Sequence, residues 1–309
     1  MLRDALLHFR LAAALSLPVV FAFLGIKCAI GLKTAHRKNR LREVFTRNTA
    51  YYSIVGVANG LFFGLFLYGL LIESQWVEVV HATIHLKKGS SLRVVHISDL
   101  HIQAFGKRER SALDHVRSAK PDLICVTGDY QRSGSGKASV PPAQRFLREL
   151  DAPYGVFAVM GNWDREGGPL FSGSKIELLL DRFVDVTVRG VKVRLSGCRF
   201  GASPRVLEDP PDDALNILLL HSPDHLEEAS QLGYDLYLAG HTHGGQVRIP
   251  GIGAIVRMSK RGYDAGLYSM GETYLYVNRG LGAEGGPLPE FRLFCRPEVT
   301  VIDLGKADE

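Results

Sequence analysis

Two long apolar runs occupy the first quarter of the chain. Residues 50–72 form 23 consecutive positions without a charged side chain, against the roughly 20 that are needed to cross a hydrocarbon core, and they predict a transmembrane helix. Residues 11–32 are also apolar, but they contain Pro18, which can kink a helix, and Lys27, which must reach the interface or find a partner. We therefore expect residues 1–75 to form a membrane anchor of two transmembrane helices.

Beyond residue 75 the pattern changes to short apolar runs separated by polar segments. Runs typical of buried strands lie at residues 92–98, 123–127, 154–160, 216–220, 235–239, 273–278 and 299–304, and residues 184–198 predict a hairpin. Helical patterns lie at residues 107–118, 175–180 and 223–232, and the Ser/Gly/Pro-rich stretch 133–142 predicts a mobile loop. Strands that alternate with helices predict an α/β (α+β) catalytic domain over residues 76–309, with two packed sheets and helices on their outer faces.

The net charge of +5 belongs to the N-terminal region alone. Residues 1–75 hold nine Lys and Arg against three Asp and Glu, whereas residues 76–309 hold 28 against 29. Because a surface that binds nucleic-acid phosphates carries a basic excess, we expect no nucleic-acid partner for the catalytic domain. The basic residues of the anchor point instead to the membrane lipid bilayer.

Residues 33–48, between the two apolar runs, carry six basic side chains and one acidic one. This composition is typical of a cytoplasmic loop or a loop that faces anionic lipid. A full span at residues 50–72 would then place the catalytic domain outside the cytoplasm, and loop and domain could share a side only if the anchor does not cross the membrane completely. Arg3 and Arg10 favour a cytoplasmic N-terminus as well. We therefore expect an integral protein of the inner (cytoplasmic) membrane and leave open the side on which its catalytic domain lies.

Five short polar clusters between residues 99 and 243 carry the candidate chemistry. The clusters are Asp99-Leu100-His101, Gly128-Asp129, Gly161-Asn162-Trp163-Asp164, His221 and Gly240-His241-Thr242-His243. Most of them directly follow an apolar run, so the ends of neighbouring strands would bring their side chains together. The four cysteines are scattered without C-x-x-C spacing, so neither a disulfide framework nor a thiolate metal site is predicted.

Carboxylates, imidazoles and one amide in these clusters predict a site for two divalent metal ions. Two cations about 4 Å apart can neutralise phosphoryl oxygens and produce a hydroxide near pH 7, which is the chemistry of phosphate ester hydrolysis. Asp129 is the candidate for the carboxylate that bridges them. Asp99 and His101, two positions apart, can bind one cation together, whereas His241 and His243 can each face a different one. Oxygen and nitrogen ligands favour Mn, with Fe or Zn as alternatives and Mg less suited.

In this order the clusters match D-x-H, G-D, G-N-x-D, H and G-H-x-H, and they resemble the signature blocks of the calcineurin-like metallophosphoesterase superfamily over about residues 92–304. Further segments resemble its membrane-associated bacterial branch, namely His221 to Asp224, Gly240 to Val247, Asn278 to Gly282 and Arg296 to Glu298. The resemblance implies a four-layer sandwich of two mixed sheets flanked by helices. It also implies a metal-dependent hydrolase of phosphoric esters or diphosphates.

The resemblance assigns roles to individual residues. It implies that the first metal is bound by Asp99, His101, Asp129 and His243, and the second by Asp129, Asn162, His221 and His241. Asn162 would also touch the phosphoryl group, so Asn162, His241 and Asp129 are the candidate catalytic residues. We expect Asp164 to orient a ligand by hydrogen bonds rather than to bind a metal.

Trp163 departs from the family pattern, which has a His at this position that can protonate the leaving group. Indole cannot do this. Loss of such an acid costs about 10² to 10⁴-fold in rate when the leaving group is a poor alkoxide, but little when it is a phosphate. We therefore expect either a diphosphate substrate or another residue in the role of the acid. Arg165 could supply positive charge to the same oxygen, so Trp163 and Arg165 are candidate substrate contacts.

An anchor, a basic loop and a phosphate leaving group together indicate a phosphorylated or diphosphate-linked lipid as substrate. Within the superfamily, the branch that fits these features hydrolyses UDP-2,3-diacylglucosamine to 2,3-diacylglucosamine 1-phosphate and UMP in lipid A synthesis, and this pyrophosphatase reaction is our specific hypothesis. That substrate implies a cytoplasmic site, so the alternative is an extracytoplasmic phosphodiesterase or phosphatase acting on envelope lipids or polymers. A third hypothesis is a non-hydrolytic, membrane-bound metal scaffold.

Overall fold

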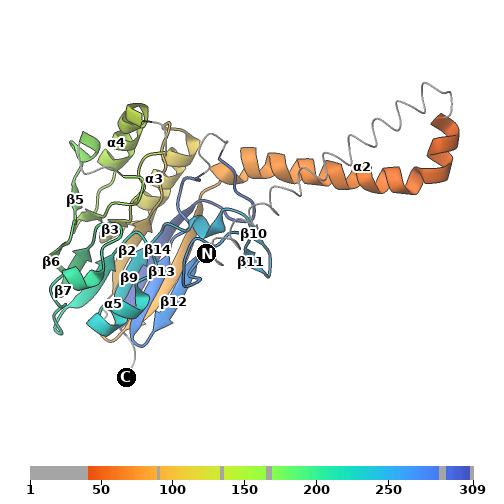
Figure 1. The fold of residues 1–309 in the computed structure, drawn as a ribbon. Coiled ribbons are helices and arrows are strands. Elements are labelled where there is room, and N and C mark those ends of the chain that lie inside the picture. The colour runs from red at the N-terminus through yellow and green to blue at the C-terminus, as the bar shows by residue number, and fades with distance from the viewer. Residues whose placement is uncertain (1–40, 89–90, 133–135, 165–168, 285–289, 307–309) are drawn as a thin grey trace. The chain divides into compact units, whose positions relative to one another are not determined.

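The computed structural model describes residues 41–306 except residues 89–90, 133–135, 165–168 and 285–289 (Figure 1). The chain divides into two compact units, Met1–Ile72 and Glu73–Glu309. The first predicted membrane span, at residues 11–32, lies outside the described residues, and so does Arg165.

The described part of the first unit is a single long helix, α2 (Leu41–Leu71). Within the described part of the chain, one helical stretch is long and apolar enough to cross a membrane, Ser53–Gln75, with a mean hydropathy of 2.0 and almost no buried positions. A helix is therefore present where residues 50–72 predict one. Its passage through a membrane stays a prediction, because length and composition alone support it.

The second unit is built on two six-stranded mixed sheets. The first sheet has the order β1-β14-β2-β3-β4-β5, formed by β1 (Glu78–Leu86), β14 (Glu298–Lys306), β2 (Leu92–Ile97), β3 (Leu123–Val126), β4 (Val156–Ala158) and β5 (Ile176–Leu178). Strands β2 to β5 are parallel, and β14 is antiparallel to β2 and parallel to β1. The carboxyl ends of β2, β3 and β4 therefore lie at one edge.

The second sheet has the order β12-β13-β9-β8-β7-β6, formed by β12 (Gly266–Met270), β13 (Thr273–Val277), β9 (Leu236–Ala239), β8 (Leu215–Leu219), β7 (Val191–Gly197) and β6 (Arg182–Val188). Its four central strands are parallel, and β6 and β12 are antiparallel edges. A separate two-stranded hairpin consists of β10 (Arg248–Ile249) and β11 (Gly253–Ala254).

The two sheets face each other across a dry core, and helices cover their outer faces (Figure 1). Helices α3 (Lys107–Ala119) and α4 (Val140–Arg148) pack on the first sheet, and α5 (Leu226–Leu232) packs on the second. Short 3₁₀ helices are η1 (Glu73–Gln75), η2 (Gly136–Ser139), η3 (Pro169–Phe171), η4 (Pro204–Val206) and η5 (His243–Gly245). The predicted sandwich of two packed mixed sheets flanked by helices is thus confirmed.

Three local predictions were wrong or incomplete. The helix predicted over residues 175–180 is instead the edge strand β5, which pairs in parallel with β4 from Val156↔Ile176 onward. β5 has only three residues, too few for the local sequence to indicate a strand, so its conformation is set by sheet pairing rather than by local propensity. The loop predicted over residues 133–142 is helical from Gly136 in η2 and α4. Strand β1 has no counterpart in the predicted elements.

Candidate metal centre

The polar clusters follow the carboxyl ends of parallel strands in both sheets. In the first sheet, Asp99 follows β2 and Asp129 follows β3, and the N–H of Asp99 donates to the carbonyl of Gly128 at 3.0 Å. In the second sheet, His221 follows β8, and its carbonyl accepts from the N–H of Gly240, which follows β9, at 3.0 Å. The two sheets thus deliver their polar side chains to the same end of the sandwich.

Five candidate ligands have left-handed backbone conformations that L side chains rarely adopt. The φ angles are 49° at Asp99, 40° at His101, 55° at Asp129, 70° at His241 and 51° at His243. Each such conformation costs on the order of 1–3 kcal/mol and persists only when the surroundings fix it. Backbone strain concentrated in this way is typical of a functional site.

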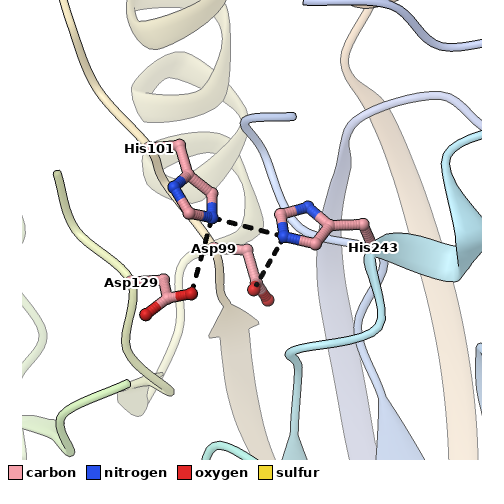
Figure 2. Close-up of side chains that lie close together, drawn as sticks. All are labelled: Asp99, His101, Asp129 and His243. Atoms are coloured by element: carbon pink, nitrogen blue, oxygen red, sulfur yellow. Dashed lines mark hydrogen bonds and ion pairs between the residues drawn. The ribbon is translucent and has the colours of Figure 1, made fainter. Parts of the chain in front are cut away.

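Four buried side chains converge on one point (Figure 2). Asp99, His101, Asp129 and His243 each offer a ligand atom, and these atoms lie within 4.8 Å of one another. The Nε2 atoms of His101 and His243 face each other at 3.2 Å, and the Oδ1 atom of Asp99 lies 3.4 Å from Nε2 of His243. Two imidazole nitrogens aimed at each other inside a carboxylate cluster fit a divalent cation between them.

Asp129 lies between this cluster and a second group of imidazoles. Its Oδ2 atom is 3.5 Å from Nε2 of His101 and 3.3 Å from Nε2 of His221. The Nδ1–H of His221 donates to the carbonyl of Thr127 at 2.5 Å, whereas its buried Nε2 has no hydrogen-bond partner. A fixed Nδ1–H leaves Nε2 of His221 pointing toward Asp129, so the Asp129 carboxylate lies between the two groups of candidate ligands.

His241 lies on the His221 side of the site. The ring centroids of His221 and His241 are 5.0 Å apart, while the ring of His243 stacks at 4.9 Å on that of His101. The two histidines of the G-H-x-H motif thus face opposite halves of the site. The ring of Phe200 lies against both His221 and His241, at 5.7 and 5.4 Å, and partly shields that half from water.

The charges of the site depend on one another. Burial raises the pKa of Asp99 to about 6. Burial alone would also raise the pKa of Asp129, but the imidazoles of His221 and His101 lower it below its ordinary value. Burial opposes a charge on His221, yet the carboxylates of Asp129 and Asp99 raise its pKa to about 10. A divalent cation would compete with this proton for Nε2 of His221, because ligand imidazoles bind metals in the neutral form.

Burial lowers the pKa of His101 to about 4 and the pKa of His241 to about 4, and it lowers the pKa of His243 well below the ordinary value. These three imidazoles are therefore neutral near pH 7, which is the form that offers a lone pair to a cation. The donor set of the site, with oxygen and neutral nitrogen atoms, suits a divalent transition metal.

Asp164 holds the loops that carry the candidate ligands. Its Oδ2 atom accepts hydrogen bonds from the backbone N–H groups of Asp129 and Gly161, both at 2.7 Å, and its Oδ1 atom accepts one from Tyr130 at 2.9 Å. Burial and the charge of Asp129 raise the pKa of Asp164 to about 6. Three backbone N–H groups on one carboxylate tie the loops of Asp129 and Gly161 together, and the role of Asp164 in orienting a metal ligand stays a prediction.

Two glycines in the motifs are required by close packing. A Cβ atom at Gly240 would overlap the Ser98 hydroxyl and the Asp99 carboxylate, and one at Gly161 would overlap the Asp129 carboxylate. Only glycine leaves these carboxylates in place. The glycines that open the G-N-W-D and G-H-T-H clusters therefore have a steric reason in this chain.

Trp163 and Asn162 lie on an exposed turn beside Asp129. The N–H of Trp163 donates to Oδ1 of Asp129 at 2.9 Å, and the Trp163 side chain is 44% exposed. The Asn162 side chain is also exposed. The site thus brings together the predicted Asp and His residues, while the predicted amide ligand lies on the turn next to them.

Glu284 and Phe200 are candidate functional residues that the sequence analysis missed. The Glu284 carboxylate accepts a hydrogen bond from the Trp163 side chain, and burial together with the charge of Asp129 raises the pKa of Glu284. Glu284 lies two residues after the Asn278 to Gly282 segment, and Phe200 lies in the loop after β7. No spacing relates either residue to a motif, so only the fold reveals them.

Comparison with known proteins agrees with this geometry. A family model described as calcineurin-like phosphoesterase matches residues 92–245. An uncharacterised metallophosphoesterase of Bacillus subtilis, YkuE, is 30% identical over 278 residues, covering 77% of this chain and 88% of its own length. The Escherichia coli phosphodiesterase YaeI is 28% identical over 247 residues, covering 75% of this chain and 90% of its own length. The chain therefore belongs to the calcineurin-like metallophosphoesterases and is a metal-dependent phosphoester hydrolase.

Proposed function

We propose that this protein is a membrane-anchored, two-metal hydrolase that cleaves a diphosphate bond in a lipid-linked substrate. The observation that carries the proposal is Trp163, which is tied by its backbone to Asp129 at 2.9 Å and stands where the family pattern has a His. A side chain without a transferable proton suits a leaving group that is already a weak base, such as a phosphate. The apolar stretch Ser53–Gln75 supports a substrate that resides in a bilayer.

We assign the first cation to Asp99, His101, Asp129 and His243, and the second to Asp129, Asn162, His221 and His241, with Mn as the preferred metal and Fe or Zn as alternatives. Two bound cations would neutralise the phosphoryl oxygens and lower the pKa of the attacking water.

The protein itself has three tasks in this reaction. The strained loops hold the Asp and His side chains at fixed positions, so little reorganisation accompanies binding. Phe200 shields the imidazoles of His221 and His241 from water. We assign to Asn162, on the exposed turn, a hydrogen bond to the phosphoryl group.

The specific substrate that we propose is UDP-2,3-diacylglucosamine. An oxygen atom bridges the two phosphorus atoms of the diphosphate. One water would be consumed and the bond from this oxygen to one phosphorus would break. The products would be 2,3-diacylglucosamine 1-phosphate and UMP. This step belongs to lipid A synthesis, and it implies a catalytic unit that faces the cytoplasm; we propose that the anchor lies in the inner membrane.

The experiment is an assay of the purified full chain with Mn on UDP-2,3-diacylglucosamine and on bis-p-nitrophenyl phosphate. We expect UMP release by the wild type and by the control variant Asp213→Ala, whose carboxylate is exposed and pairs with Lys192. We expect none from Asp129→Ala. Hydrolysis of bis-p-nitrophenyl phosphate without any release of UMP from the lipid would contradict the proposed substrate while leaving the hydrolase in place.

A second candidate is an extracytoplasmic phosphodiesterase or phosphatase for envelope lipids or polymers. Glu284 favours it, because a carboxyl group beside Trp163 could take the place of the missing acid. The basic residues 33–48 also favour it. A reporter fused after Glu309 that is active only in the periplasm would support this candidate and exclude the lipid A reaction.

A further inference from the structure

Four large apolar side chains are exposed on neighbouring segments of the catalytic unit. The exposed fractions are 50% for Trp76, 43% for Ile249, 73% for Ile252 and 48% for Phe294. Ile249 and Ile252 lie on the hairpin of β10 and β11, and Ile252 is in its turn. Large apolar side chains that gather at a surface mark an interaction site.

Hydrogen bonds connect the segments that carry these side chains. The N–H of Arg248 in β10 donates to the carbonyl of Leu293 at 2.9 Å, and the N–H of Cys295 donates to the Glu73 carboxylate at 2.5 Å. The guanidinium group of Arg296 lies 3.8 Å above the Trp76 ring. We refer to the surface formed by Trp76, Ile249, Ile252, Phe294 and Arg296 as the apolar rim.

Phe294 is held in this surface by a strained backbone. Its φ angle is 54°, in the left-handed region that a bulky aromatic residue rarely adopts. Cys295, the next residue, is fully buried, whereas the Phe294 side chain is half exposed. Strain that turns an aromatic ring outward, rather than into the core, is consistent with a function for the ring at the surface.

Basic side chains lie among the apolar ones of the rim. Arg248 precedes Ile249 in β10, and Arg296 lies over the Trp76 ring. Two further basic side chains of residues 246–263, Arg257 and Arg261, pair with carboxylates. Apolar side chains among basic ones are typical of surfaces that lie in the headgroup region of anionic membranes. Trp and Arg are both residues that anchor proteins at the membrane interface.

The position of the apolar rim along the chain identifies its partner. The apolar stretch Ser53–Gln75 ends one residue before Trp76, so the rim begins where the proposed membrane span ends. We propose that the apolar rim docks into the interfacial layer of the lipid bilayer in which the chain is anchored. This inference rests on the proposed membrane anchor and deepens the proposed function.

The apolar rim also adjoins the metal centre. The Cys295 thiol donates to the carbonyl of His243 at 3.3 Å, and the side chain of Arg248 donates to the carbonyl of Gly244 at 2.9 Å. His243 is one of the four converging ligands, and Ile249 follows it by six residues. Docking therefore brings the metal centre to the headgroup layer, so that a lipid can present its phosphates while its acyl chains stay in the bilayer.

Tryptophan fluorescence tests the docking directly, because Trp76 and Trp163 are the two tryptophans of the chain. Both are replaced by Phe in the full chain, and Ile252→Trp is added as a probe. In vesicles of phosphatidylcholine and phosphatidylglycerol, we expect brominated acyl chains to quench the probe and its emission to shift to the blue. The matched control is Met270→Trp in the same background, an exposed position at the end of β12 farthest along the sheet from the G-H-x-H loop. This control should show neither change.

An unquenched Ile252→Trp probe in vesicles would overturn the proposal, whether the surface is open to water or covered by a second copy of the chain.

A charge variant gives a second readout. Ile249→Asp with Ile252→Asp should lower turnover of a vesicle-embedded diphosphate lipid by roughly tenfold or more, because two apolar side chains lose their burial in lipid. It should leave turnover of soluble bis-p-nitrophenyl phosphate unchanged, and equal losses on both substrates would also contradict docking. Quenching of the probe without hydrolysis of the lipid would support docking and contradict the proposed substrate.

Discussion

Replacing Asp164 by asparagine separates the positioning of the metal ligands from the stability of the fold. Asp164 accepts three backbone hydrogen bonds, from Asp129 and Gly161 on one oxygen and from Tyr130 on the other. The amide of Asn can keep the first two through its carbonyl oxygen. Its NH₂ group would face the N–H of Tyr130, which loses its acceptor and pushes the loop of Asp129 out of place.

The stability terms of this substitution oppose each other. An orphaned buried amide costs about 1–3 kcal/mol. Burial and Asp129 raise the pKa of Asp164 from 3.8 to about 6, so an ionised carboxylate at pH 8 costs about 3 kcal/mol that a neutral amide avoids. We therefore expect the free energy of unfolding of Asp164→Asn at pH 8 to stay within about 2 kcal/mol of the wild type.

The metal affinity should respond much more strongly. Loss of a hydrogen bond that orients a ligand typically costs about 10 to 100-fold in metal affinity. The assays are Mn titration by calorimetry and urea unfolding of the metal-free protein, with Asp213→Asn as the exposed carboxylate-to-amide control. An Asp164→Asn variant with wild-type Mn affinity would refute the positioning role, and a variant that unfolds before it can be titrated would show that the role is structural.

Three further predictions follow from the site and its surroundings. Trp163→His should raise kcat/KM for a phosphodiester with an alkoxide leaving group by about 10²-fold or more. If steady-state kinetics show no gain, the absence of an acid at position 163 does not determine the leaving group. Removal of metal with EDTA should lower the melting temperature. Mn at about 100 times its Kd should restore about 2.7 kcal/mol of the free energy of unfolding. A thermal-shift assay should show the melting temperature recover in the wild type and recover little in Asp129→Ala. Burial lowers the pKa of His96 to about 3 in the folded protein, from an ordinary value of 6.5. At a pH between these two values, the unfolded chain binds a proton on His96 that the folded chain does not. His96 should therefore contribute about 2 kcal/mol to the loss of stability between pH 7 and pH 5, and His96→Gln should remove that part of the slope in urea unfolding.

The local pattern predicts much of the fold because buried parallel strands have a strong signal. The apolar runs that became β2, β3, β8 and β9 are short, continuous and followed by polar clusters. Since the carboxyl ends of parallel strands meet at one edge, the pattern predicts that the clusters of one sheet lie together. That the clusters of both sheets meet at one site was implied by the family resemblance and not by the strand pattern.

The remaining features depend on contacts between distant segments. Strand β5 is defined by its pairing with β4, and β1 by its pairing with β14. β5 is only three residues long, and β1 directly follows the long apolar stretch of the N-terminal helix, so neither was assigned from its local pattern. Glu284 reaches the site because the loop after β13 passes Trp163. The apolar rim likewise gathers side chains from segments near residues 76, 250 and 294, which are far apart in sequence, so no local pattern could predict it.

In the proposed metal centre, Asp129 joins two cations that are held by the loops of both sheets. Electron paramagnetic resonance of the Mn-loaded full chain tests it most directly, because two Mn ions about 4 Å apart share a carboxylate and couple magnetically. We predict an exchange-coupled signal in the wild type that is lost in Asp129→Ala and kept in Asp213→Ala. A wild-type spectrum of isolated Mn ions only, or a coupled spectrum that survives Asp129→Ala, would contradict the account.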